Sequence, residues 1–185
     1  MQTNDEESLV SKENLRYLEH HNSYSDSKLR RILRDVKTFA MVGASSVWRR
    51  PSYYAMTYLQ HKGFRIIPIN PARAGETVLG EKVYGSLSDV PYQLDMVDIF
   101  RTSLEAYKIT KDVIANKDKL GLKYLWMQLT VRNDMAAELA EKAGLEVVMD
   151  RCPKIEFGRL SGELSWLGVN SNIISAKTLK SPKAN

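Results

Sequence analysis

Apolar residues follow two alternating periods along the middle of this 185-residue chain. In residues 29–36 they fall three, four and seven positions apart, which is typical of a short amphipathic helix, and Ser25 or Ser27 can cap its start. Residues 38–43 then form an almost unbroken apolar run, which favours a strand that is buried on both faces. The chain therefore changes from a helical period to a strand period at its first organised segment.

The same alternation continues as far as residue 149. The predicted strands are 38–43, 64–70, 95–100, 123–129 and 145–149. The predicted helices are 52–61, which Gly63 closes, 134–143, which Gly144 closes, and one that begins at a capping box of Thr102 and Glu105 and ends near Gly121. Because crossovers between parallel strands are right-handed and place helices on both faces, this order predicts a single α/β domain with a Rossmann-like, doubly wound parallel sheet. An α+β arrangement of the same elements is the alternative.

Polar segments frame this organised middle. We divide the chain into an N-terminal arm at 1–24, the Rossmann-like domain at 25–165 and a C-terminal tail at 166–185. Trp166 and the apolar residues that follow it are too hydrophobic for a free tail. We therefore expect the tail to dock partly, on its own domain, on a second copy in a homodimer or on another protein partner.

Composition limits the classes of protein that fit. A hydrophobic content of 43% suits a globular domain, and the net charge of +5 favours anionic partners. The basic residues are spread along the sequence, so nucleic acid is not required as a partner. The single cysteine excludes an intramolecular disulfide, the acidic N-terminus lacks the apolar core of a signal peptide, and no stretch is apolar enough to span a membrane. We expect a soluble cytoplasmic protein with no membrane partner.

The predicted fold also locates a binding site. In doubly wound sheets, ligands bind outside the carboxyl ends of the strands at the point where the strand order reverses. This rule selects residues 43–52, which follow the first strand, and Phe100, Arg101 and Thr102 across the crevice. The expected site is therefore a crevice between two loops.

The loop at 43–52 has the composition of an anion site. Gly43 permits a sharp turn close to a ligand, and the small residues at 44–46 leave backbone N–H groups and hydroxyls free. Pro51 can open a helix whose first N–H groups favour an anion, and Arg50 can add charge-assisted hydrogen bonds. The alternative is a plain turn with exposed arginines.

The sequence also limits which anion fits. A nicotinamide dinucleotide calls for G-x-G-x-x-G after the first strand and an acidic residue after the second, whereas this chain has G-A-S-S-V-W and Asn70 at these places. A Walker motif is absent from the sequence. Arg73 could accept an extra phosphate, which keeps open an adenosine nucleotide that carries an added ribose phosphate.

A series of short motifs carries a family resemblance. V-G-A-S, R-P-S, I-P-I-N-P, V-D-I-F-R, W-M-Q-L and M-D-R-C-P-K-I-E occur in this order between about residue 29 and residue 160. Together they resemble the CoA-binding domain family of small bacterial proteins, which is similar to the nucleotide-binding domain of the succinyl-CoA ligase α subunit. The resemblance implies a Rossmann-like domain that binds coenzyme A through its 3′-phospho-ADP, with the pantetheine arm along the crevice. It does not imply ligase chemistry, because the domain with the phosphorylated histidine has no counterpart here.

Carried over by position, the resemblance implies which residues surround the ligand. Those that line the diphosphate would be Gly43, Ala44, Ser45 and Arg50, with Ser46 and Ser52 beside them. Those around the nucleotide and its ribose phosphate would be Asn70, Pro71 and Arg73, and those of the opposite wall and the pantetheine would be Phe100, Arg101 and Gln128. Arg101 would be costly to bury without an anionic partner, although a neighbouring carboxylate could serve instead. For Gln128 the alternative is a hydrogen-bonded polar group at a strand end.

Catalysis has weaker support in the sequence. Cys152 lies between Arg151 and Lys154, which could lower the pKa of its thiol and yield a nucleophile or a mixed disulfide with the CoA thiol. No histidine base is evident nearby, and the alternative for a free cysteine is a small buried hydrophobic residue. Asp98 lacks a paired acid and is expected to cap a turn.

A resident metal is not expected either. One cysteine and three histidines, two in the arm and one at the end of a helix, form no ligand cluster at a recognised spacing. The sequence therefore favours a non-catalytic protein that binds coenzyme A or an acyl-CoA. The alternative is an NADP-dependent oxidoreductase or a CoA-dependent acyltransferase.

Overall fold

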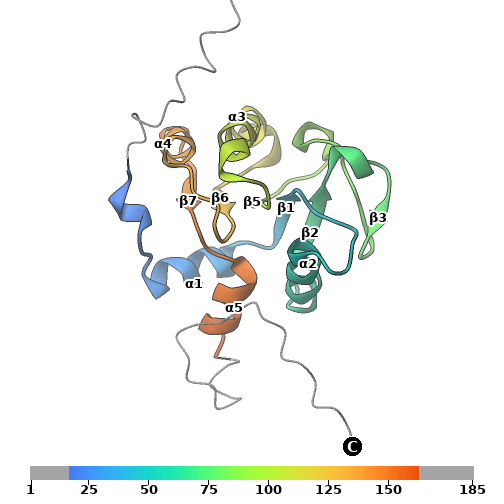
Figure 1. Ribbon diagram of the computed structural model, residues 1–185, viewed down its shortest axis with the longest axis horizontal. Helices are drawn as coiled ribbons and strands as arrows, with labels where there is room; N and C mark the ends of the chain where they lie inside the picture. Colours follow the sequence, from blue (N-terminus) through green and yellow to red (C-terminus); the bar gives the residue numbers. More distant parts are fainter. Residues whose placement is uncertain (1–16, 163–185) are drawn as a thin grey trace, which may run out of the picture.

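The computed structural model describes residues 17–162 and contains a five-stranded parallel sheet between two layers of helices (Figure 1). Its strands, in spatial order, are β2 (Arg65–Ile69), β1 (Thr38–Val42), β5 (Met96–Ile99), β6 (Tyr124–Met127) and β7 (Glu146–Val148). The chain runs outward from β1 to β2, returns to β5 on the other side of β1 and continues to β6 and β7. This topology confirms the predicted Rossmann-like α/β domain, and its strand order reverses between β1 and β5.

Helices cover both faces of the sheet (Figure 1). One face carries α3 (Ser103–Leu120) and α4 (Asp134–Lys142). The other carries α1 (Asp26–Asp35), α2 (Pro51–His61) and α5 (Pro153–Leu160). Each face has its own buried apolar cluster, and successive strand residues contribute to opposite clusters. Burial on both faces explains why the strands are almost unbroken apolar runs.

The helix ends follow the signals in the sequence. The Ser25 side chain accepts a hydrogen bond from the backbone N–H of Lys28 and so caps α1. The capping box of Thr102 and Glu105 starts α3, and Gly121, with φ of 72°, closes it in the left-handed conformation. Local side-chain chemistry therefore sets where these helices begin and end.

Several short elements were not predicted. The loop after β2 contains a hairpin of β3 (Thr77–Val78) and β4 (Glu81–Lys82), and α5 follows β7. The remaining elements are the short 3-10 helices η1 (Glu19–His21), η2 (Pro71–Arg73) and η3 (Leu87–Asp89). Arg65 holds the hairpin against β2, because its Nε and Nη2 donate to the two carboxylate oxygens of Glu81 at 2.8 and 3.1 Å. Elements this short have too few residues for a visible period.

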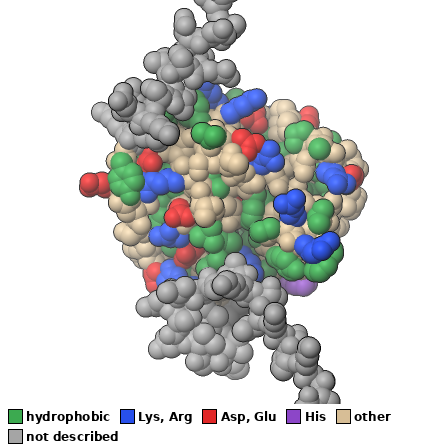
Figure 2. Space-filling model, in the orientation of Figure 1, with side chains coloured by type: hydrophobic (Ala, Val, Ile, Leu, Met, Phe, Trp, Pro, Cys, Tyr) green, Lys and Arg blue, Asp and Glu red, His purple; other side chains and the backbone are tan. Residues whose placement is uncertain are grey.

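The surface is mixed in charge. On the face shown in Figure 2, basic side chains are interspersed with acidic and apolar ones and do not form one continuous basic patch. No helix within residues 17–162 has the length and apolar character needed to cross a bilayer. The expected docking of Trp166 and its neighbours, and most of the expected N-terminal arm, fall outside the described residues.

Candidate functional site

The crevice at the reversal of strand order is shaped by Gly43. Its φ is 89°, and its N–H donates to the carbonyl oxygen of Ile69 at 2.9 Å. A Cβ at this position would lie 2.5 Å from the carbonyl oxygen of Phe100 and 2.6 Å from Cδ of Arg101. The loop after β1 and the loop after β5 can therefore meet this closely only if the residue is glycine.

Side-chain hydrogen bonds hold the loop between β1 and α2 in place. Asn70, at the end of β2, donates from Nδ2 to the carbonyl oxygen of Ala44 at 2.8 Å. The buried hydroxyl of Ser52 accepts from the N–H of Ser45 at 3.1 Å, and Oγ of Ser45 accepts from the N–H of Val47 at 3.1 Å. The loop is thus a fixed turn that leads into α2 at Pro51.

Several N–H groups of this loop are available to a ligand. Within the part of the chain that the structure describes, the N–H groups of Ala44, Ser46 and Ser52 donate to no protein acceptor. The guanidinium of Arg50 is exposed and makes no hydrogen bond or ion pair with residues 17–162. Unpaired N–H groups and a free cation at the start of a helix form a site that favours an anion. Arg49 packs over the exposed ring of Trp48, 5.6 Å from its centroid.

The other two arginines of the predicted site already have partners. The Nε of Arg101 donates to Oε1 of Glu105 at 3.0 Å, and its side chain is 51% exposed. Arg101 is therefore not a buried charge that needs an anionic ligand. Its partner is the carboxylate of Glu105, which is the alternative that the sequence left open. Arg73 forms an exposed ion pair with Glu76 at 3.2 Å. Both pairs are exposed, and such pairs are weak enough to be exchanged for a phosphate.

The side chain of Asn70, at the end of β2, is also occupied by hydrogen bonds within the protein. Oδ1 of Asn70 accepts from the N–H of Ala72 at 3.0 Å and so caps η2, which begins at Pro71. Together with the bond to Ala44, this uses both ends of the amide. Asn70 therefore ties the loop after β1 to the loop after β2, and both loops border the same edge of the sheet.

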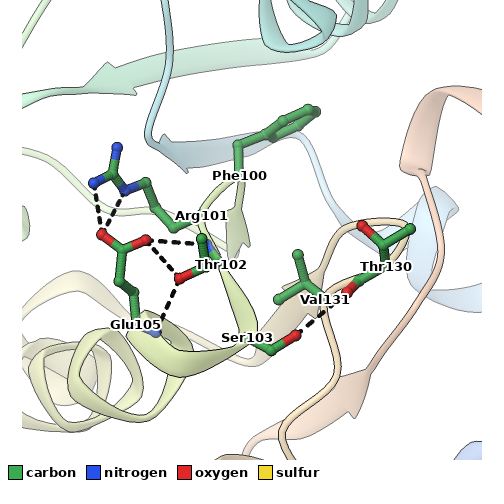
Figure 3. Close-up of a pocket in the computed structure, with 7 residues that line it drawn as sticks. All are labelled: Phe100, Arg101, Thr102, Ser103, Glu105, Thr130 and Val131. Atoms are coloured by element: carbon green, nitrogen blue, oxygen red, sulfur yellow. Dashed lines mark hydrogen bonds and ion pairs between the residues drawn. The ribbon is translucent and has the colours of Figure 1, made fainter.

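A solvent-open hollow of about 500 Å³ lies beside this crevice, at the carboxyl ends of β5 and β6. Its lining residues are Phe100, Arg101, Thr102, Ser103, Glu105, Thr130 and Val131 (Figure 3). Figure 3 shows Arg101 and Thr102 directed toward Glu105, while Oγ of Ser103 donates to the carbonyl oxygen of Thr130 at 3.3 Å. The sequence predicted Phe100 and Arg101 at this edge of the sheet but did not indicate Ser103, Thr130 or Val131. The only indication in the sequence was that Thr130 and Val131 directly follow the predicted strand 123–129, which places them at the binding edge of the sheet.

The loops after β6 and β7 each contain a residue with an unusual backbone conformation. Thr130 has φ of 68° and Asp150 has φ of 52°, and neither is glycine. The N–H of Thr130 donates to Oδ1 of Asp150 at 2.7 Å, which links the loops after β6 and β7. Non-glycine residues with positive φ persist where their surroundings hold them, and they are frequent at binding sites.

Asp98 and Gln128 form a buried pair below the carboxyl edge. Asp98 is fully buried in β5, and Nε2 of Gln128 donates to its two carboxylate oxygens at 3.0 and 3.2 Å. Burial raises the pKa of Asp98 to about 8, and the hydrogen bond from Gln128 opposes this only in part. The expectation that Asp98 caps a turn is wrong, because its neighbours in the sheet hold it inside the strand. Gln128 is a hydrogen-bonded polar group, and its contact with pantetheine stays a prediction.

Cys152 does not have the environment of a nucleophile. The residue is buried, and burial raises the pKa of its thiol, with the nearby Asp98 carboxyl acting in the same direction. The expectation of a lowered pKa from Arg151 and Lys154 is therefore wrong. Desolvation outweighs the opposing hydrogen bonds from the backbone of Ile155 and Lys154. The Arg151 guanidinium is engaged elsewhere, because it donates to the Asp150 carbonyl and lies 3.9 Å from Glu156. The alternative, a small buried hydrophobic residue, is confirmed.

A doubly wound sheet with a fixed small-residue loop at its reversal point defines a nucleotide-binding class of domain. Residues 37–158 match the family model described as CoA binding domain, and the chain belongs to this family. The family resemblance carried by the motifs is thereby confirmed.

Individual relatives agree with this assignment. The uncharacterized protein YneT of Bacillus subtilis strain 168 is 28% identical over 131 residues, which cover 71% of this chain and 93% of YneT. A hypothetical protein from Pyrococcus horikoshii OT3 is 35% identical with a TM-score of 0.69, over 76% of this chain and 94% of its own. The cell-free protein ID.343 from Thermus thermophilus is 34% identical with a TM-score of 0.69, over 74% of this chain and 99% of its own.

Proposed function

We propose that the chain binds coenzyme A or an acyl-CoA without catalysing a reaction on it, and holds the nucleotide and diphosphate at the carboxyl ends of β1 and β5. The observation that carries the proposal is the loop after β1, where unpaired N–H groups and the free Arg50 guanidinium surround the turn at Gly43. The chain belongs to the CoA binding domain family, and a diphosphate at this loop would accept hydrogen bonds from these N–H groups and from the guanidinium.

The proposed ligand extends in two directions from the diphosphate. Toward β2, Asn70 and Pro71 border the adenosine, and Arg73 turns from Glu76 to the ribose phosphate. Toward β5, the pantetheine arm passes Phe100 and Arg101 and enters the open hollow beside them. This path uses the loops after β1, β2, β5 and β6, which all border one edge of the sheet.

The burial of the thiol of Cys152 and of the carboxyl of Asp98 supports a non-catalytic role. Cys152 is buried with a raised pKa, and Asp98 has no solvent-exposed surface. Neither group can reach a thioester in the hollow without rearrangement of the loops. Neither Cys152 nor Asp98 therefore offers the acyltransferase alternative an exposed nucleophile. The NADP alternative lacks the G-x-G-x-x-G turn after β1, where this chain has G-A-S-S-V-W.

The first experiment compares ligands on the full chain by thermal shift and calorimetry. Coenzyme A and acetyl-CoA are expected to raise the melting temperature, because ligand at a hundred times its Kd stabilises the folded state by about 2.7 kcal/mol. NADP is expected to give no shift. Stabilisation by NADP alone would contradict the proposal and support an oxidoreductase.

A second comparison addresses the ribose phosphate. Dephospho-CoA is expected to bind more weakly than coenzyme A, because it lacks the phosphate that we assign to Arg73. In Arg73→Ala the two ligands should bind with similar affinity, whereas Arg34→Ala, an exposed change on α1, should preserve the difference. Equal affinity of the wild type for both ligands would remove Arg73 from the site but leave the diphosphate site intact.

A further inference from the structure

The N-terminal segment 17–24 runs from beside α4 to the start of α1 (Figure 1). The N–H of Leu18 donates to Oδ1 of Asp134 at 2.8 Å, and Nη2 of Arg132 donates to the Leu18 carbonyl oxygen at 2.9 Å. These bonds fix the segment at the start of α4. The histidines of η1 are thereby placed beside Glu141 near the other end of the helix.

Three ligand atoms converge at this place. Nε2 of His20 lies 3.1 Å from Oε1 of Glu141, and Nε2 of His21 lies 3.2 Å from the same oxygen. All three atoms lie within 4.8 Å of one another. In a tetrahedral site with metal–ligand bonds of about 2.0–2.1 Å, neighbouring ligand atoms are about 3.3 Å apart. Both distances to the glutamate therefore match the edge of a tetrahedral metal site.

The buried imidazole of His21 supplies an independent observation. The residue is 1% exposed, and its Nε2 has no hydrogen-bond partner in residues 17–162. The nearby Glu141 oxygen is within reach, but the two atoms are not aligned for a hydrogen bond. A cation between Nε2 of His21 and Oε1 of Glu141 would give both atoms a partner, because the lone pair of each would point at the ion. An unsatisfied buried polar atom in a native fold calls for such an explanation.

The other ring nitrogen of His21 is also held. Nδ1 lies 2.8 Å from the hydroxyl of Tyr24, which in turn accepts from the N–H of Met149 at 2.7 Å. Histidines that ligate metals commonly use the second ring nitrogen in this way, which fixes the orientation of the ring. Tyr24 is therefore a positioning residue for the imidazole.

We propose that His20, His21 and Glu141 bind a divalent transition-metal ion of the zinc type, which fastens the segment 17–24 to α4. Two imidazoles and one carboxylate form a donor set that suits zinc, and three protein ligands leave a fourth position for water. The three ligands lie on η1 and α4 and include no residue of the proposed CoA site.

The test uses the full chain without a polyhistidine tag, treated with chelator and then titrated with zinc by calorimetry. We expect one equivalent to bind, with a rise in melting temperature, and cobalt(II) at the same site to show the visible absorption of tetrahedral coordination. His20→Ala and Glu141→Gln should each weaken binding at least tenfold. Both residues are partly exposed, so the variants should keep their fold, which far-UV circular dichroism checks.

Matched controls separate this site from general surface binding. His61→Ala removes an exposed histidine on α2, and Glu138→Gln removes a carboxylate one turn earlier on α4; both variants should bind zinc as the wild type does. Absence of binding by the wild type would overturn the proposal and leave an ordinary contact between histidines and a carboxylate. Equal zinc affinity in all variants, or equal loss in all of them, would overturn it as well.

Discussion

At the scale of single residues, the geometry of the crevice depends on Gly43. The loops after β1 and β5 approach each other so closely at this residue that a Cβ would overlap the backbone of Phe100. The positive φ of Gly43 adds a second requirement for glycine. The lack of space and the backbone conformation therefore both exclude a side chain at this position. The turn that we propose to bind the diphosphate needs the same backbone conformation at Gly43.

The substitution Gly43→Ala should both destabilise the fold and weaken CoA binding. Overpacking against a backbone atom costs about 1–3 kcal/mol in addition to the strain of the positive φ. Gly63→Ala is the matched control, because Gly63 has φ of 90° but open space around it, and should cost only the strain, about 1–2 kcal/mol. Urea denaturation gives both stabilities and calorimetry gives the affinity. Equal stability of the two variants would show that the close contact is relieved without cost.

Asp98 makes a prediction about pH. Its pKa of about 8 in the folded state lies well above the ordinary value near 3.9 that it takes in the unfolded chain. Between these values the folded state binds one more proton than the unfolded state, so the stabilisation is complete below pH 4 and is lost as the pH rises toward 8. The contribution falls by at most about 1.4 kcal/mol per pH unit.

The variant Asp98→Asn removes this titration and keeps an oxygen that can accept from Gln128. Its free energy of unfolding should therefore decrease less than that of the wild type between pH 5 and pH 8, as measured by urea denaturation at both values. If the two proteins lose the same stability over this interval, the carboxyl of Asp98 is not protonated in the folded state.

At the scale of secondary-structure elements, the start of α3 links stability to the site. The hydroxyl of Thr102 donates to Oε2 of Glu105 at 2.8 Å, and Oε1 of the same carboxylate accepts from Arg101. These hydrogen bonds, those of Thr102 first, hold the pKa of Glu105 below its usual range. The residue that caps the helix therefore also positions the carboxylate that orients Arg101.

Thr102→Ala should remove this arrangement at the cost of a helix cap, about 1 kcal/mol. Thr102→Ser is the matched control, because it retains the hydroxyl and should lose much less stability. Chemical denaturation of the three proteins measures the difference. A stability equal to the wild type in Thr102→Ala would mean that the cap contributes nothing to the fold.

The elements differ in how far the sequence could predict them. The strands and longer helices had clear periods and end signals, such as Ser25 and Gly121, and the structure contains them with boundaries shifted by one or two residues. The hairpin of β3 and β4 and the helix α5 were missed. They are short, and contacts from elsewhere in the chain stabilise them, such as the ion pair between Arg65 and Glu81. The periodicity of a segment reflects only its own residues, so it cannot predict an element that depends on contacts with distant parts of the chain.

At the scale of the whole molecule, topology decides which residues meet. The reversal of strand order between β1 and β5 followed from the order of elements, and with it the close approach of the loops at Gly43 and Phe100. The burial of Asp98 and Cys152 did not follow, because it depends on neighbours from several strands. The expectation of no metal cluster rested on spacing along the chain, whereas Glu141 is 121 positions from His20. Spacing along the chain cannot show that a distant helix brings a carboxylate next to the histidines.

The most direct test of the account is calorimetric titration of coenzyme A into the wild type, Arg50→Ala and Arg34→Ala. Arg50 in the loop after β1 has no ion-pair partner among residues 17–162, and its loss should weaken binding by about 1.5–3 kcal/mol, the range for hydrogen bonds to charged groups. Arg34 lies on α1, outside the proposed site, and its loss should leave the affinity unchanged. No heat of binding by the wild type at millimolar coenzyme A, or equal affinity in all three proteins, would contradict a diphosphate site at this loop.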